Sequence, residues 1–104
     1  MSAEYSTDIK KYTKKVDDAA VGSITKFLGI ALKNADSRLV SCTDEKELDR
    51  IIVGFAAKKL GLTEAAAKGA IQKVCERMKA DNTKHRVTFY YLLAEETGTL
   101  SKLA

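Results

Sequence analysis

The chain of 104 residues contains no proline, a single histidine and only two cysteines. Its longest apolar run falls far short of the roughly twenty residues that span a bilayer. The opening residues, MSAEYSTDIKKY, lack the apolar segment of a secretory signal, and no N-x-S/T glycosylation site occurs. These absences argue against a membrane protein and predict a soluble protein in a reducing, cytoplasmic setting.

The scarcity of histidine and cysteine also limits the chemistry. Cys42 and Cys75 stand far apart, so neither belongs to a CxxC pair, and His85 has no second histidine to join it. Zinc sites and thioredoxin-type redox sites therefore lack their usual ligand spacing. The motifs GxxxxGK[ST], GxGxxG and HExxH are absent as well. We expect no metal and no cofactor, and the sequence favours a protein that is not an enzyme.

What is present is an ordinary globular composition, with 45% hydrophobic and 31% charged residues. The length suits one domain over residues 1–104, in which residues 1–16 form a peripheral, frayed segment. The net charge of +4 makes a polyanionic partner worth considering. However, the net charge is +2 for residues 1–40, +2 for 41–80 and zero for 81–104, so no segment is a basic arm.

The densest positive cluster contains four lysines near the N-terminus, arranged as two i,i+4 pairs. Such a cluster either contacts nucleic acid or forms a solvated face, and the second interpretation is favoured. The candidate nucleic-acid contacts are Lys10, Lys11, Lys14 and Lys15.

Apolar residues at helical spacing predict an all-α fold, a compact bundle of four main helices plus a short N-terminal helix. The short helix covers about residues 7–16, and the main helices cover about residues 17–33, 44–60, 63–78 and 84–97. Thr43 or Asp44 and then Thr63 are the expected N-caps, while Gly61 and Gly98 are expected to end helices in the left-handed conformation.

The helix expected over residues 17–33 contains two glycines, Gly22 and Gly29, away from its main apolar stripe. Either a neighbouring element crosses closely at these positions, or the helix simply tolerates them. The apolar stripe itself predicts the core residues of this helix: Ala20, Ile24, Phe27, Leu28 and Ala31.

The stretch HRVTFYYLLAEETG, residues 85–98, is apolar on more than one side if helical, which is typical of a central buried helix. A strand is the rival, because VTFYY is β-prone, but a lone strand would leave its backbone groups unpaired. His85 is interpreted as a helix-start residue rather than a base or metal ligand. Tyr90 and Tyr91 are interpreted as core residues rather than as base-stacking residues assisted by Lys84 and Arg86. Whether residues 89–93 are fully buried or form an interface is left open.

The two cysteines carry different expectations. Cys75 lies in an apolar stripe beside Val74 and Met78 and is expected to be an inert buried thiol. Cys42 is a candidate reactive thiol, because a position just before a helix N-terminus can lower a thiol pKa. The acidic residues Asp44, Glu45 and Glu47 oppose that shift.

Three segments in combination carry a family resemblance: KFLGIALKNADSRLVSCTDEKELDRI, FAAKKLGLTE and VCERMKADNTKHRVTFYYLLAEETGTL. From about Tyr12 onward the chain resembles small bacterial proteins described as domain of unknown function 2853. The resemblance implies a compact α-helical single domain in bacterial cytoplasm. It implies no activity, because the family has no established catalytic or binding residues.

The leading functional hypothesis is a non-catalytic helical module that binds another protein or a second copy of itself. It follows from a well-capped helical scaffold without a recognisable catalytic, metal or phosphate-loop motif. The alternative is a small basic protein associated with nucleic acid. A thiol-dependent or acid–base enzyme that uses Cys42 or His85 ranks third.

Overall fold

The computed structural model describes residues 9–13, 16–29, 40, 42–79 and 85–103. These residues form an all-α fold with four main helices and no β-strand among them, as the sequence predicts. The elements are α2 (Asp18–Leu28), α3 (Glu45–Ile51), the π-helical turn η2 (Ile52–Ala56), α4 (Glu64–Arg77), α5 (Arg86–Glu96) and the 3-10 turn η3 (Leu100–Lys102).

Side-chain caps begin three of the helices. The Asp17 carboxylate accepts from the backbone N–H of Ala19 and Ala20 and so starts α2. Of the two expected caps for α3, Asp44 is the one that accepts, at 3.1 Å from the Lys46 nitrogen. Thr63 caps α4 as predicted. Each cap satisfies backbone donors that the first helical turn leaves without partners.

Glycines end several helices, and one of them does so at a position predicted to lie inside a helix. Gly61 and Gly98 have φ angles of +66° and +68°, which confirms the left-handed positions expected there. Gly29 has a φ of +39° and is the C-cap of α2, so α2 ends at Leu28. At Gly22 no described atom lies within 4 Å of the place that a Cβ would occupy, so of the two alternatives the described residues favour simple tolerance over a close crossing.

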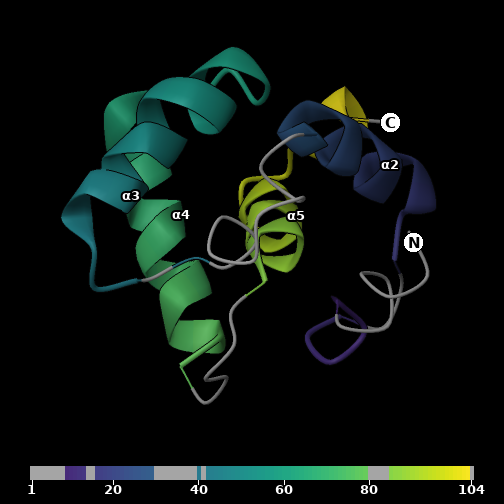
Figure 1. Cartoon of the computed structure of the whole chain (residues 1–104), viewed down its shortest axis with the longest axis horizontal. Helices are drawn as coiled ribbons and strands as arrows, with labels where there is room; N and C mark the ends of the chain where they lie inside the picture. The colour runs from purple at the N-terminus through teal and green to yellow at the C-terminus, as the bar shows by residue number, and fades with distance from the viewer. Residues whose placement is uncertain (1–8, 14–15, 30–39, 41, 80–84, 104) are drawn as a thin grey trace.

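Helix α5 occupies the middle of the fold (Figure 1), with α2 on one side and α4 on the other. Every residue from Val87 to Ala94 is buried, including Tyr90 and Tyr91. The interpretation of this stretch as a central helix with core tyrosines is therefore confirmed. Residues 89–93 are buried, so they do not form an exposed interface. In the part of the chain that the structure describes, no helix is both long and apolar enough to cross a membrane.

The helix expected over residues 44–60 is not regular throughout. Between α3 and Gly61 it widens into the π-helical turn η2, in which Ile52, Phe55 and Ala56 are buried while Val53 is 67% exposed. A π-turn adds one residue to a helical turn and so changes the direction of the side chains after it. Here it directs the Phe55 ring onto Tyr90 of α5, with ring centroids 4.3 Å apart.

Polar contacts fix how the outer elements sit on α5 and α4. The Tyr91 hydroxyl accepts from the backbone N–H of Asp17 at 2.8 Å, which joins α5 to the start of α2. Arg77 of α4 pairs with Glu95 at 3.1 Å and donates to the Tyr12 carbonyl at 2.8 Å. The described N-terminal residues 9–13 form one hydrogen-bonded turn there, anchored by the fully buried Ile9. The rest of the short helix expected over residues 7–16 lies largely outside the described residues.

We expect Tyr91→Phe to lower the free energy of unfolding by about 1 to 2 kcal/mol, because it leaves the Asp17 N–H without its acceptor in a partly buried place. Urea denaturation at neutral pH measures this change. Ser101→Ala, which removes an exposed hydroxyl, is the matched control and should change stability by less than about 0.5 kcal/mol. Equal effects of the two substitutions would contradict this role for Tyr91.

Candidate functional site

A groove runs between α3 and α4. It consists of a hollow of about 440 Å³ and a neighbouring one of about 620 Å³, which share four lining residues and are therefore continuous. The shared residues are Glu45, Leu48, Ile71 and Gln72. We call this continuous feature the α3–α4 groove.

The apolar floor of the groove follows from the packing of η2 against α4. Leu48 is half-buried, and Ile52 and Ile71 are 6% and 2% exposed. Because Leu48 retains exposed surface at the mouth of the groove, this part of the core is open to an apolar side chain from outside.

The walls of the groove differ in charge. The α3 wall carries the carboxylates of Glu45 and Asp49. The α4 wall carries Lys68 and Glu76, and Lys79 extends it just after the end of the helix. Lys68 also forms an exposed i,i+4 pair with Glu64 at 3.3 Å. The groove thus has an acidic side and a mixed side around an apolar floor.

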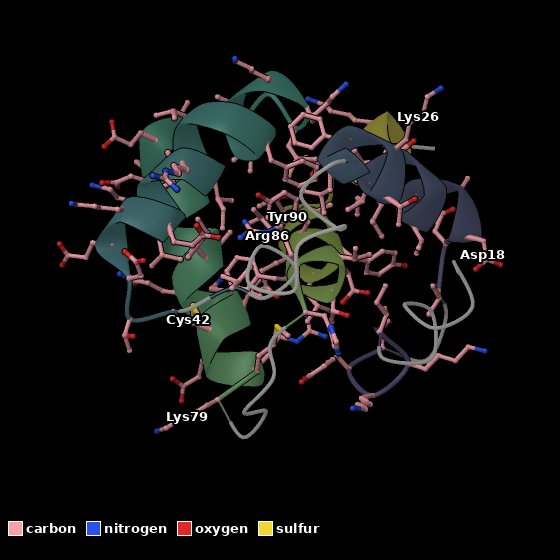
Figure 2. The ribbon with its side chains drawn as sticks, viewed as in Figure 1. Asp18, Lys26, Cys42, Lys79, Arg86 and Tyr90 are labelled. Atoms are coloured by element: carbon pink, nitrogen blue, oxygen red, sulfur yellow. A yellow bond between two sulfur atoms is a disulfide. The ribbon has the colours of Figure 1, made fainter. Side chains whose placement is uncertain are left out.

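A disulfide between Cys42 and Cys75 lies at one end of the groove. Figure 2 shows Cys42 beside α4, with Lys79 further toward the C-terminal end of that helix. The Cα atoms are 5.9 Å apart, within the usual range for a disulfide. The bond joins the residues just before α3 to the C-terminal half of α4.

This disulfide corrects the expectation of two independent thiols. Neither cysteine is free in the structure, so Cys75 is not an inert thiol, and Cys42 can act as the predicted reactive thiol only once this bond is reduced. Both residues are partly buried. Sequence spacing gave no signal, because the pair is separated by 33 positions and meets only in the folded chain, in which η2 packs against α4.

Arg86, a candidate phosphate contact in the base-stacking alternative, is instead part of a mostly buried ion pair. Its guanidinium contacts Glu47, and the two side chains are 12% and 14% exposed. Arg86 also lies 5.9 Å from the centre of the Tyr90 ring and donates to the Tyr90 hydroxyl at 3.4 Å. Figure 2 shows Arg86 and Tyr90 together in the centre of the molecule. The pair ties α3 to the first turn of α5 and does not line the groove.

The other predicted site residues do not converge on the groove. Lys10 and Lys11 are exposed on the N-terminal turn, and Lys14 and Lys15 lie outside the described residues. His85 is the half-buried N-cap residue of α5 and makes no side-chain capping bond. Among the described residues, no group of three or more histidine, cysteine or acidic side chains is arranged to hold a metal ion.

We expect reduction of the disulfide to lower the free energy of unfolding by about 3 to 4 kcal/mol, the loop-closure entropy for a 33-residue separation. Urea denaturation with and without a phosphine reductant measures the difference. The Cys42→Ser/Cys75→Ser variant should match the reduced protein and ignore the reductant. Alkylation of the untreated, unfolded protein at both cysteines would contradict the pairing.

The pH dependence of stability should show the burial of Tyr90. Burial raises the pKa of Tyr90, against a lowering by its hydrogen bond and charge contact with Arg86. The unfolded side chain ionises near pH 10, whereas the folded one stays neutral to higher pH. Its contribution to stability is therefore complete below about pH 10 and is lost as the pH rises beyond that value.

Tyr90→Phe should accordingly lose less stability between neutral pH and about pH 11 than the unmodified protein does. Urea denaturation across this range measures the free energy of unfolding of each protein relative to its own free energy at neutral pH. The difference between the two profiles reports Tyr90, because the lysines titrate in both proteins. Parallel pH profiles would show that Tyr90 ionises normally.

Comparison with known proteins agrees with the resemblance seen in the sequence. No curated protein matches the chain. The family model described as Protein of unknown function (DUF2853) matches residues 4–101, which is nearly the whole length and includes α2 to α5. The helical bundle with its α3–α4 groove therefore belongs to the family described as Protein of unknown function (DUF2853).

Proposed function

We propose that this protein is a non-catalytic helical module that binds a segment of another protein in the α3–α4 groove. The observation that carries the proposal is the continuity of the groove, since two hollows share Glu45, Leu48, Ile71 and Gln72. Recognition of this kind places the apolar face of an amphipathic helix in a groove between helices. Leu48 at the mouth of the groove is the apolar anchor point.

The charges on the walls indicate the kind of segment that fits. Glu45 and Asp49 make the α3 wall acidic, so a partner helix gains from lysine or arginine along the edge that faces α3. The α4 wall carries both signs and favours no single charge. The proposed partner is therefore an amphipathic helix with an apolar face and one basic edge.

A cytoplasmic location is part of the proposal. Disulfides in that compartment are usually transient or redox-sensing, so the Cys42–Cys75 bond would form and break with the redox state of the cell. Because the bond lies at the end of the groove, its state would set how firmly the start of α3 is held against α4.

The proposal predicts that a photo-crosslinking amino acid at position 72 captures a partner that the same group at position 66 does not. Gln72 lines the groove on α4, whereas Ala66 is exposed on the same helix and does not line it. Peptide mapping of the crosslinked product by mass spectrometry should find an amphipathic helix with basic residues. Crosslinks to a second copy of this chain would show that the groove serves self-association and not the binding of another protein.

The recombinant partner segment then provides a quantitative check. Glu45→Lys/Asp49→Lys should weaken its binding by roughly tenfold or more, because it reverses two charges on the acidic wall. Lys46→Glu/Arg50→Glu reverses two charges on α3 that do not line the groove, and serves as the control. Identical crosslinks from positions 72 and 66, or equal effects of the two double variants, would refute the proposal.

A further inference from the structure

A separate hollow of about 340 Å³ lies where the end of α2, the segment after η2 and the C-terminal turn η3 meet. Figure 2 shows Lys26 on this side of the molecule, beside the C-terminal turn and away from Cys42. Among the described residues, its lining contains three lysines, an aromatic ring and no acidic residue, in contrast to the α3–α4 groove. The described residues that line it are Ser23, Lys26, Phe27, Lys59, Lys102 and Leu103.

Phe27 does not lie in the core as the sequence predicts, but stands in this hollow with 39% of its surface exposed. The buried stripe of α2 runs through Ala20, Val21, Ile24 and Leu28, so Phe27 lies at its edge. The Phe55 ring packs against it at an angle, with centroids 5.5 Å apart. This contact holds the ring in place while part of it remains open to a ligand.

Within the described part of the chain, none of the three lysines is paired with a carboxylate. The Lys59 ammonium lies over the Phe27 ring, 5.4 Å from its centre. Lys102 Nζ donates to the Leu60 carbonyl at 3.0 Å and passes close to Gly61, where an added Cβ would lie 3.0 Å from it. An ammonium has three N–H donors. One of them binds the Leu60 carbonyl and positions Lys102, and the other two can donate to an anion.

We propose that this hollow binds a nucleotide unit, with the base stacked on Phe27 and the adjacent phosphate held by Lys26, Lys59 and Lys102. Aromatic rings next to unpaired basic residues are the combination that binds single-stranded nucleic acid. Because no described carboxylate lines the hollow, a phosphate avoids the repulsion that it would meet in the α3–α4 groove. The hollow accepts such a unit either from a free nucleotide or from a single strand.

Stacking and phosphate binding support each other at this site. An arriving base takes the place of Lys59 on the Phe27 ring, and stacking of a base on an aromatic ring is generally stronger than the contact of an exposed lysine with it. The displaced ammonium is then available to the phosphate next to the base. Lys10 and Lys11, by contrast, belong to the N-terminal turn, which Figures 1 and 2 place away from Lys26 and η3.

Fluorescence anisotropy with a short fluorescein-labelled oligothymidylate, on the intact chain, tests the proposal. The logarithm of the affinity should fall with the logarithm of salt concentration with a slope of about −0.7, as expected when the lysines together neutralise one phosphate of a single strand. Unlabelled oligothymidylate, thymidine monophosphate and duplex DNA are added as competitors. If the monophosphate competes at a concentration similar to that of the unlabelled oligonucleotide, the ligand is a free nucleotide. If only the oligonucleotide competes, the ligand is the single strand.

Two variants separate the stacking from the charge. Phe27→Leu should weaken binding by roughly tenfold and leave the salt slope unchanged, because it removes the ring and no charge. Lys26→Ala/Lys59→Ala should also weaken binding and bring the slope closer to zero, because only Lys102 remains to contact the phosphate. Lys58→Ala/Lys73→Ala removes two exposed lysines outside the hollow and is the matched control.

Thermal denaturation of each variant excludes loss of folding as the cause. Retained stability, with weakened binding only in the variants of the hollow, supports the proposal. No binding to either ligand at low salt overturns it. Equal loss of binding in the Lys58/Lys73 control overturns it too, because that result shows a diffuse charge effect. Competition by duplex DNA as strong as that by the single strand also overturns it, because paired bases cannot stack on Phe27.

Discussion

The burial of α5 on every side is the constraint on which the rest of the structure depends. From Val87 to Ala94 no residue of this helix reaches solvent appreciably. A helix of this kind has no polar face to turn outward, so other elements must cover it all round. α2 covers one side and α4 the other, η2 brings Phe55 onto Tyr90, and η3 packs at its C-terminal end. The surfaces left for function are consequently those between the covering elements.

Apolar packing against a helix does little to determine the orientation of its neighbours. Here, buried polar contacts determine that orientation. The Arg86–Glu47 pair is mostly removed from water, and no other described donor satisfies Glu47 Oε1. Replacing such a pair by apolar residues is often neutral, whereas removing one partner strands a charge at a cost of several kcal/mol. The pair thus selects one position of α3 relative to α5 more than it stabilises the fold. Arg77 does the same for the N-terminal turn through Glu95 and the Tyr12 carbonyl.

Local signals in the sequence were sufficient for most helix ends and insufficient for the sites. Thr63, Gly61 and Gly98 act within one turn of their own positions, so their roles could be predicted without knowledge of the fold. The disulfide could not be predicted, because Cys42 meets Cys75 only in the folded chain, in which η2 packs against α4. The exposure of Phe27 likewise could not be predicted from the local sequence. Its helical spacing matched the buried stripe, but the termination of α2 at Gly29 and the packing of Phe55 decided which edge of that stripe is covered.

The two candidate surfaces show why net charge is a poor guide to the partner of this protein. A value of +4 suggests a polyanion, yet the larger groove carries carboxylates along α3, which disfavour one. The smaller hollow has three lysines and no carboxylate among its described lining residues, although it draws the lysines from α2, the segment after η2, and η3. Coulomb attraction in water fades within a Debye length of about 8 Å at physiological salt. A phosphate therefore responds to the charges lining one hollow, and their arrangement in the fold matters more than their sum along the chain.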